Sequence, residues 1–150
     1  MGIGFARARK RKDDKAFFYE QLYLSLVFLV VGLNGVFLGF LPHVFFSDYV
    51  AGTIGWAKGS PFQLEVGYHN GCWGVLGLLS PWFKGGFALA SGIGFSLFLL
   101  LAGWGHLRET LFHGNFEPGN FGFIAGDILP GILLLVLARL YYKRTLKNGL

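Results

Sequence analysis

The sequence predicts an all-α integral membrane protein: a four-helix bundle that spans the membrane, with both the N- and C-termini cytoplasmic. Hydrophobic residues make up 53% of the 150 residues and charged residues only 14%, whereas soluble domains average about 25% charged residues. Long apolar segments alternate with short polar ones, and basic residues gather at the two ends of the chain. Such a chain has too little polar surface to coat a water-soluble fold, so we expect lipid to surround it.

Four apolar segments are predicted to cross the bilayer as helices. Each is long enough for a hydrocarbon core of about 30 Å when helical, and too long for a membrane barrel strand. A helix also satisfies its own backbone hydrogen bonds inside lipid. We expect Pro130 to kink or loosen the fourth segment. The predicted spans are about residues 22–46, 62–83, 87–107 and 121–142.

Polar segments flank and connect these spans. Residues 1–21 are expected to form a basic interfacial arm, and residues 143–150 a basic tail, on either side of a membrane domain at 22–142. The predicted connections are a loop or short interfacial segment at 47–61, a tight turn at 84–86 and a polar loop at 108–120.

The basic residues predict the orientation, because cytoplasmic flanks of membrane spans carry the excess of lysine and arginine. Of the 13 such residues, the N-terminal arm holds six, the turn at Lys84 one and the C-terminal end four, which leaves Lys58 and Arg108 on the opposite side. Both termini are therefore predicted to be cytoplasmic, and we expect the membrane to be the bacterial inner membrane. Basic flanks of this kind are a topology signal, so we expect no nucleic-acid partner.

Pairs of glycines four residues apart predict close packing between helices, because small residues let helix backbones approach. A compact monomer and a homo-oligomer that associates through one of these faces both fit the pattern. The pairs are Gly35 and Gly39, Gly67 and Gly71, and Gly122 and Gly126.

The second span has two different faces at 100° per residue. Glu65, His69 and Cys72 fall on one side, and a groove of glycines with Asn70 falls on nearly the opposite side. Neither a carboxylate nor a glycine groove favours lipid contact. We therefore expect this helix to be the most enclosed of the four.

Ionisable side chains within a membrane are costly and often mark a functional site. The predicted topology places most of them in the non-cytoplasmic half of the bundle. The candidate ligand-binding or network residues are Glu65, His69, Asn70, His106, Arg108, Glu109 and Asp127.

Three interpretations of this cluster stay open. The residues could form a hydrogen-bonded network that fixes helix register, with Arg108 neutralising a carboxylate. They could form a metal or redox site, because Glu65 and His69, and His106 and Glu109, share helix faces; the duplicated motif of di-iron bundles is missing, so no metal ligand is assigned. They could also bind a quinone or lipid head group, or relay protons through Glu65 and Asp127.

The start of the second span resembles a known family. Residues 59–67, GSPFQLEVG, are similar to the G-x-P-F-Q-x-E-V-G signature of small, uncharacterised bacterial membrane proteins, and Gly105-His106 and the P-G-N-x-G run at 118–122 are also similar. The resemblance covers about residues 22–142 and implies a four-helix membrane fold without an established activity. More distantly, the layout is similar to DoxX-like proteins, some of which are linked to quinone redox chemistry; no catalytic residue is carried over.

These observations favour a non-enzymatic accessory subunit of a larger membrane assembly, whose polar cluster binds lipid or quinone. One alternative is a DoxX-like redox protein that handles quinone or metal, and another is a proton-relay or transport subunit. The expected partners are the lipid bilayer and either another membrane protein or further copies of the chain. The sequence does not identify a cofactor; a quinone or a lipid is compatible with the polar cluster.

Overall fold

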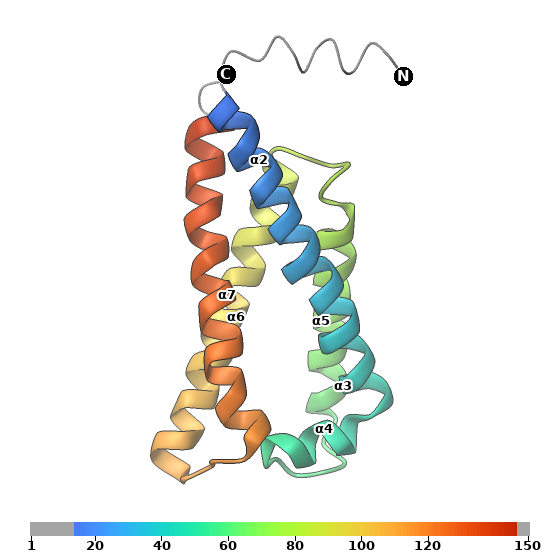
Figure 1. The fold of residues 1–150 in the computed structure, drawn as a ribbon. Helices are drawn as coiled ribbons and strands as arrows, with labels where there is room; N and C mark the ends of the chain where they lie inside the picture. Colours follow the sequence, from blue (N-terminus) through green and yellow to red (C-terminus); the bar gives the residue numbers. More distant parts are fainter. Residues whose placement is uncertain (1–13, 147–150) are drawn as a thin grey trace.

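The computed structural model describes residues 14–146, and every regular element in that range is helical. Most of the predicted basic arm, residues 1–13, and the last four residues of the predicted tail lie outside the described residues. Figure 1 shows the long helices running roughly side by side, with one short helix lying across an end.

The first helix is continuous from Lys15 to Phe45. Its successive parts are α2 (Asp14–Leu26), the π-helical stretches η1 (Val27–Leu33) and η2 (Gly35–Phe40), and α3 (Leu41–Phe45). Residues 14–21, which the sequence predicts as part of a separate interfacial arm, are continuous with the first helix; their position at the membrane interface stays a prediction. Glu20 explains part of this difference, because its carboxylate is buried against Lys84 at 3.2 Å instead of facing solvent.

A short helix occupies about the first half of the segment predicted as a loop or interfacial segment. The chain bends at Phe46 and forms α4 (Ser47–Ile54), which ends at Gly55 with a left-handed φ of 79°. Glycine suits this end because it adopts positive φ without a steric cost. The following loop is tied back to α4 by a 2.7 Å hydrogen bond from the Gly59 N–H to the Asp48 carboxylate.

The remaining elements are α5 (Phe62–Leu79), α6 (Gly86–His113), α7 (Pro118–Tyr141) and the π-helical η3 (Tyr142–Leu146). The polar loop predicted at 108–120 is much shorter in the structure, because α6 continues to His113 and α7 begins at Pro118. Gly114 ends α6 with a φ of 65°, and proline suits the first turn of α7, where no N–H is needed. α7 continues through Pro130 without interruption.

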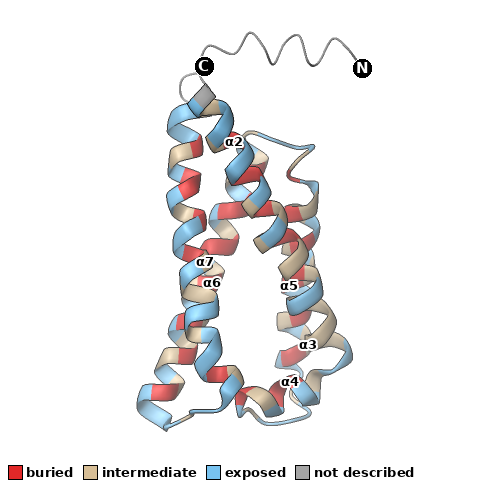
Figure 2. Cartoon of the chain, in the orientation of Figure 1, coloured by how far each residue is buried: buried red, intermediate tan, exposed pale blue. Residues whose placement is uncertain are grey.

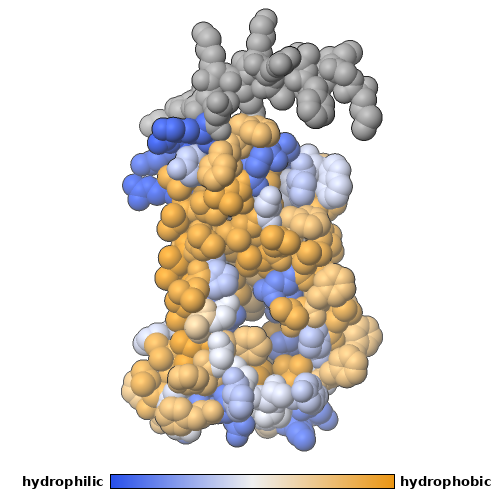
Figure 3. Space-filling model, in the orientation of Figure 1, coloured by the Kyte–Doolittle hydropathy of each residue, from blue (hydrophilic) through white to orange (hydrophobic). Residues whose placement is uncertain are grey.

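Within residues 14–146, three helices are long and apolar enough to cross a membrane: Lys15–Phe45, Gly86–His113 and Pro118–Thr145. α5, with 18 residues, is not among them, because its first half carries Gln63, Glu65, His69 and Asn70. Figure 3 shows apolar side chains over the middle of the molecule and hydrophilic ones mainly toward its ends. These features indicate a membrane protein.

The main hydrophobic core lies between the first helix, α6 and α7. Tyr23 and Tyr141 stack with ring centroids 4.8 Å apart, and the Tyr23 hydroxyl donates to the Ala88 carbonyl at 3.1 Å. Phe95 and Leu134 are buried in the same cluster. Figure 2 shows buried residues mainly on the inward sides of the helices.

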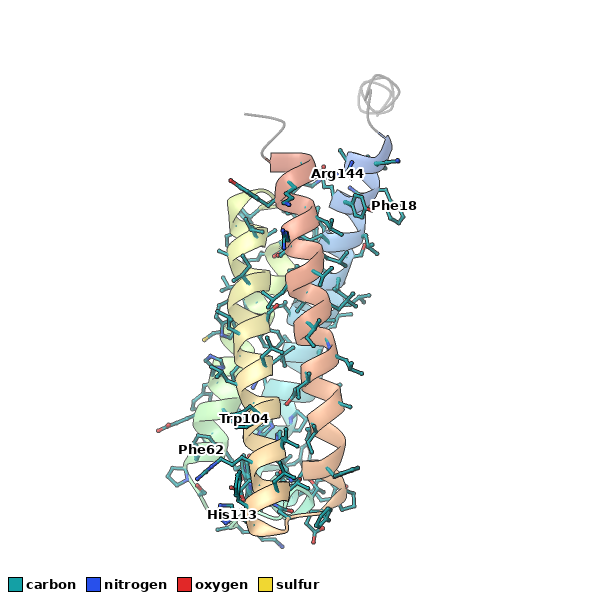
Figure 4. All side chains as sticks on the ribbon, turned by 90° about the vertical axis from the view of Figure 1, so that its left-hand side faces the viewer. Phe18, Phe62, Trp104, His113 and Arg144 are labelled. Atoms are coloured by element: carbon teal, nitrogen blue, oxygen red, sulfur yellow. The ribbon has the colours of Figure 1, made fainter. Side chains whose placement is uncertain are left out.

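The start of α2 and the end of α7 lie at one end of the molecule, which we call the terminal end; the opposite end is the α4 end. The Thr145 hydroxyl donates to the Ala16 carbonyl at 3.3 Å, and the Arg144 guanidinium lies over the Tyr19 ring at 5.9 Å. Figure 4 shows Phe18 and Arg144 at the terminal end and Phe62 and His113 toward the α4 end.

Glycines bring α5 and the first helix close together. A Cβ atom on Gly35 would lie 3.0 Å from the Asn70 carbonyl oxygen and the Gly74 Cα atom, and a Cβ atom on Gly39 would meet the Asn70 side chain. Gly67 faces Val44, and Gly71 faces Phe40.

The third glycine pair behaves differently. A Cβ atom on Gly122 would meet nothing within 4 Å, and one on Gly126 only a ring of its own helix, at 3.7 Å. Within one chain this pair packs against no other described helix, because both glycines lie on the exposed side of α7; helix packing through this pair, between copies of the chain, stays a prediction.

Candidate functional site

A cavity of about 310 Å³ lies between the two helix pairs, in the half of the molecule nearer the α4 end. The first helix and α5 form one wall, and α6 and α7 form the other. Most of its lining is apolar, and none of the described residues that line it is a lysine, an arginine or a glutamate. Its strongly polar lining side chains are Asn34, His43, Asn70, His106 and Asp127.

The cavity has exposed apolar residues at its side and a helix across its end. Leu38 of η2 and Phe123 of α7 both line it and are 68% and 43% exposed. Figure 3 shows the surface hollowed between α7 and the first helix, with hydrophilic side chains beside the hollow. At the α4 end Ile54 covers the cavity, and the Asn115 amide donates to the Ile54 carbonyl at 2.9 Å. Access is therefore lateral, from the side of the helices.

His106 is held in one orientation by a buried amide. Asn120 is fully buried, and its Nδ2 donates to the Thr110 hydroxyl and the Asn115 carbonyl, each at 2.9 Å. The Asn120 Oδ1 must then be the acceptor of its 2.8 Å contact with Nδ1 of His106. Nδ1 of the imidazole therefore carries a proton, and Nε2 is the nitrogen left for other partners.

Aromatic rings and a carboxyl group complete the surroundings of His106. The Trp56 ring lies parallel to the imidazole with centroids 5.9 Å apart, and the Phe123 ring lies 5.6 Å away. Nε2 of His106 lies 3.9 Å from Oδ2 of Asp127, and both side chains are largely buried. The loop after α4, the end of α6 and the start of α7 thus meet at one imidazole and one carboxyl group.

The opposite wall carries a second imidazole. Nδ1 of His43, at the end of the first helix, lies 2.6 Å from Oε1 of Gln63, which is only 1% exposed. Asn70 is buried about two helical turns beyond Gln63 along α5, where its amide donates to the Val66 carbonyl at 2.9 Å. The two walls therefore present hydrogen-bonding groups to the same cavity.

Three of the seven predicted site residues come together at this cavity: Asn70, His106 and Asp127. The other four lie elsewhere. Glu65 and Arg108 are exposed, and Glu109 faces His113 at 3.8 Å. His69 is also exposed, and its Nε2 accepts a 2.9 Å hydrogen bond from the Trp73 indole.

The position of α5 explains why Glu65 and His69 lie apart from the cluster. The prediction that this helix is the most enclosed of the bundle is wrong, because only its glycine face is buried. That face packs on the first helix, and the cavity separates part of α5 from α6 and α7. The opposite face, with Glu65, His69 and Cys72, remains exposed. Glu65 and Asp127, which the relay hypothesis pairs, therefore do not share the cavity.

The described part of the chain holds no group of side chains that would support the metal interpretation. Within residues 14–146, no group of three or more histidine, cysteine, aspartate or glutamate side chains is placed to hold a metal ion. The pairs at His106 and Asp127 and at Glu109 and His113 each supply two such groups.

Residues 1–147 match a family of unknown function, DUF6790. The chain belongs to this family. No curated protein and no solved structure matches it. Because the function of the DUF6790 family is unknown, membership does not indicate an activity. The similarity to DoxX-like proteins stays a prediction.

Several residues at the site of this DUF6790 chain could not be predicted from the sequence. Asn120 and Gln63 are uncharged amides, which give no electrostatic reason to single them out in a sequence. Trp56 gives no reason to be singled out either, because tryptophans in such chains are usually packing residues or anchors at the membrane interface. The P-F-Q run at 61–63 and the P-G-N run at 118–120 were the available signals, since each holds one of the two buried amides.

Proposed function

We propose that this chain is a small, non-enzymatic membrane protein whose cavity binds the head group of an uncharged amphipathic molecule, a quinone or a neutral lipid, from the bilayer. The observation that supports this most strongly is the lateral cavity of about 310 Å³, which is apolar except for a few hydrogen-bonding side chains. Ligand sites in proteins have this character and start at about this volume.

The charges around the cavity support an uncharged head group. A phosphate group would find no lysine or arginine among the lining residues, and it would lie near the carboxyl group of Asp127. Anionic head groups are normally bound by such cations. The exposed Leu38 and Phe123 at its side suit a ligand with an apolar tail that extends into lipid.

In the proposed topology α5 also crosses the membrane, as the second of four spans, and both termini are cytoplasmic. Its 18 residues give a length of about 27 Å at 1.5 Å per residue, close to the hydrocarbon thickness of about 30 Å. The start of α2 and the end of α7 lie at the same end, which supports an even number of crossings. Lys84, Lys143 and Arg144 lie at that end, which supports its assignment to the cytoplasmic side of a bacterial inner membrane.

The exposed face of α5 supports a role as an accessory subunit. Glu65 and His69 are exposed, and ionisable residues at membrane depth usually face protein or water. A neighbouring membrane protein, or another copy of the chain, would shelter them.

A matched pair of glycine variants tests the binding proposal. Gly105 lines the cavity and Gly122 lies on the outer side of α7, and at both positions a Cβ atom would meet nothing within 4 Å. Gly105→Phe should fill the cavity, whereas Gly122→Phe should leave it open. We expect Gly105→Phe to bind the ligand about tenfold more weakly, a loss of about 1.4 kcal/mol in binding free energy, and therefore to retain less of it.

The measurement is mass spectrometry of organic extracts from protein purified in native-membrane particles without detergent. Equal retention by the wild type and both variants, or no stoichiometric quinone or lipid in any of them, would contradict the binding proposal. The size of the same particles tests the accessory role, which fails if the wild-type chain is found there as a lone monomer.

A further inference from the structure

We propose that the gap between Nε2 of His106 and Oδ2 of Asp127 is a seat for one hydroxyl oxygen of the ligand, and that the ligand is a quinol-type ring. This inference rests on the proposed function, because it names the ligand class of the same cavity. It concerns recognition alone and involves no electron transfer.

The distance between the two side chains supports such a seat. At 3.9 Å, Nε2 and Oδ2 are too far apart for a direct hydrogen bond, since these bonds span about 2.7 to 3.2 Å. A single oxygen atom placed beside the gap can lie within hydrogen-bond distance of both. Both groups are largely buried and line the cavity, so a ligand atom can reach them.

Proton counting indicates a hydroxyl group. Nδ1 of His106 donates to Asn120, so Nε2 accepts when the imidazole is neutral. If Asp127 were then ionised, the pair would leave an uncompensated negative charge inside the membrane, which is costly. With one proton on either group, the pair presents one donor and one acceptor. A hydroxyl satisfies both, a carbonyl only the donor, and an ether oxygen likewise only the donor.

The rest of the cavity supports a ring with two oxygen atoms. His43 lies on the opposite wall and, among the described residues that line the cavity, is the only other titratable one; α4 contributes Ile54 and α5 contributes no charged group. Its contact with Gln63 leaves the other imidazole nitrogen for a second ligand oxygen. Trp56 and Phe123 beside His106 provide flat apolar surfaces for a ring.

Four probes test the seat in the wild-type chain, reconstituted in nanodiscs of phosphatidylethanolamine and phosphatidylglycerol. They are a short-tailed benzoquinol, the corresponding quinone, the dimethyl ether of the quinol, and dioleoylglycerol, with affinities measured by calorimetry. We expect the quinol to bind about tenfold more tightly than the quinone or the ether, because each of these leaves one buried polar group unpaired. An ether that binds as tightly as the quinol overturns the seat, and tighter binding of dioleoylglycerol overturns the quinol assignment.

Variants separate this inference from the proposed function. Asp127→Leu should weaken quinol binding about tenfold, and Asp127→Asn, which keeps a donor and an acceptor, should restore most of it. Glu109→Leu is the matched control, because Glu109 forms a similar pair with His113 outside the cavity. If Gly105→Phe abolishes binding while Asp127→Leu does not change it, the seat is wrong and the cavity function stands. If Gly105→Phe has no effect on binding, the cavity function is wrong. If Asp127→Leu does not fold, the relative affinities of the four probes for the wild-type chain still test the seat.

Discussion

At the scale of single residues, one buried amide organises the candidate site. Asn120 holds Nδ1 of His106 and also bonds to the Thr110 hydroxyl and the Asn115 carbonyl. The same side chain therefore orients the imidazole and joins the end of α6 to the start of α7. Asn115 extends this connection to α4 through the Ile54 carbonyl.

Replacing this amide with an apolar side chain of similar size should destabilise the protein. Asn120→Leu would leave Nδ1 of His106 without its partner, whereas the Asn115 carbonyl would keep only its 3.1 Å hydrogen bond from the Thr110 hydroxyl. An unpaired buried polar group costs about 1 to 3 kcal/mol. We expect a loss of free energy of unfolding in that range, measured by denaturation in mixed micelles. Phe121→Leu, at the exposed neighbouring position, is the control. A loss no larger than that of the control would show that the amide network contributes little.

Residue chemistry explains which parts of the site could be predicted. His106 and Asp127 could be singled out because ionisable groups are rare within apolar spans. The helical wheel of the second span separated its two faces correctly but could not tell which of them meets the rest of the bundle. Gln63 and Asn120 could not be singled out, because amides carry no charge and the second lay in a predicted loop.

At the scale of elements, the closest helix contact joins α5 to the first helix. A Cβ atom on Gly77 would collide with backbone atoms of Gly32 and Val31, which cannot move aside as a flexible side chain would. The separation between these two helices is thus set by glycine. The wall of the cavity formed by Asn34, Gly39 and Asn70 depends on this spacing.

Gly77→Ala should therefore push the two helices apart. Overpacking of this kind costs about 1 to 3 kcal/mol, and we expect a loss of that size in detergent unfolding experiments. The matched variant Gly122→Ala adds the same methyl group where no neighbour lies within 4 Å, so it should be neutral or slightly stabilising, because alanine favours helices over glycine. Equal effects of both variants would refute the proposed role of Gly77.

The helices that could be predicted from the sequence are those whose length and apolar composition are enough to identify them. Long apolar stretches predict membrane-compatible helices, and three such helices are present in the described residues. The π-helical stretches η1 and η2 pack against α5, and no feature of the local sequence distinguishes them from an ordinary α-helix. α4 is short enough that its sequence equally fits a loop.

At the scale of the whole molecule, the structure has an apolar middle and two different ends. The terminal end joins the start of α2 to η3 and holds the Glu20–Lys84 ion pair. The α4 end is closed by α4 and by the bonds of Asn115. The cavity opens toward the side, between these ends, so its proposed use depends on lipid surrounding that part of the molecule.

The most direct test of this arrangement asks whether α5 crosses the membrane, because the cavity then lies within the bilayer. Single cysteines at Ser60 and Gly86, which flank α5, are introduced into a Cys72→Ser background, and intact cells are treated with a membrane-impermeant maleimide. We predict that Ser60→Cys reacts from outside, whereas Gly86→Cys reacts only after the cells are permeabilised. Reaction of both positions from the same side would contradict the four-span topology and, with it, a cavity inside the membrane.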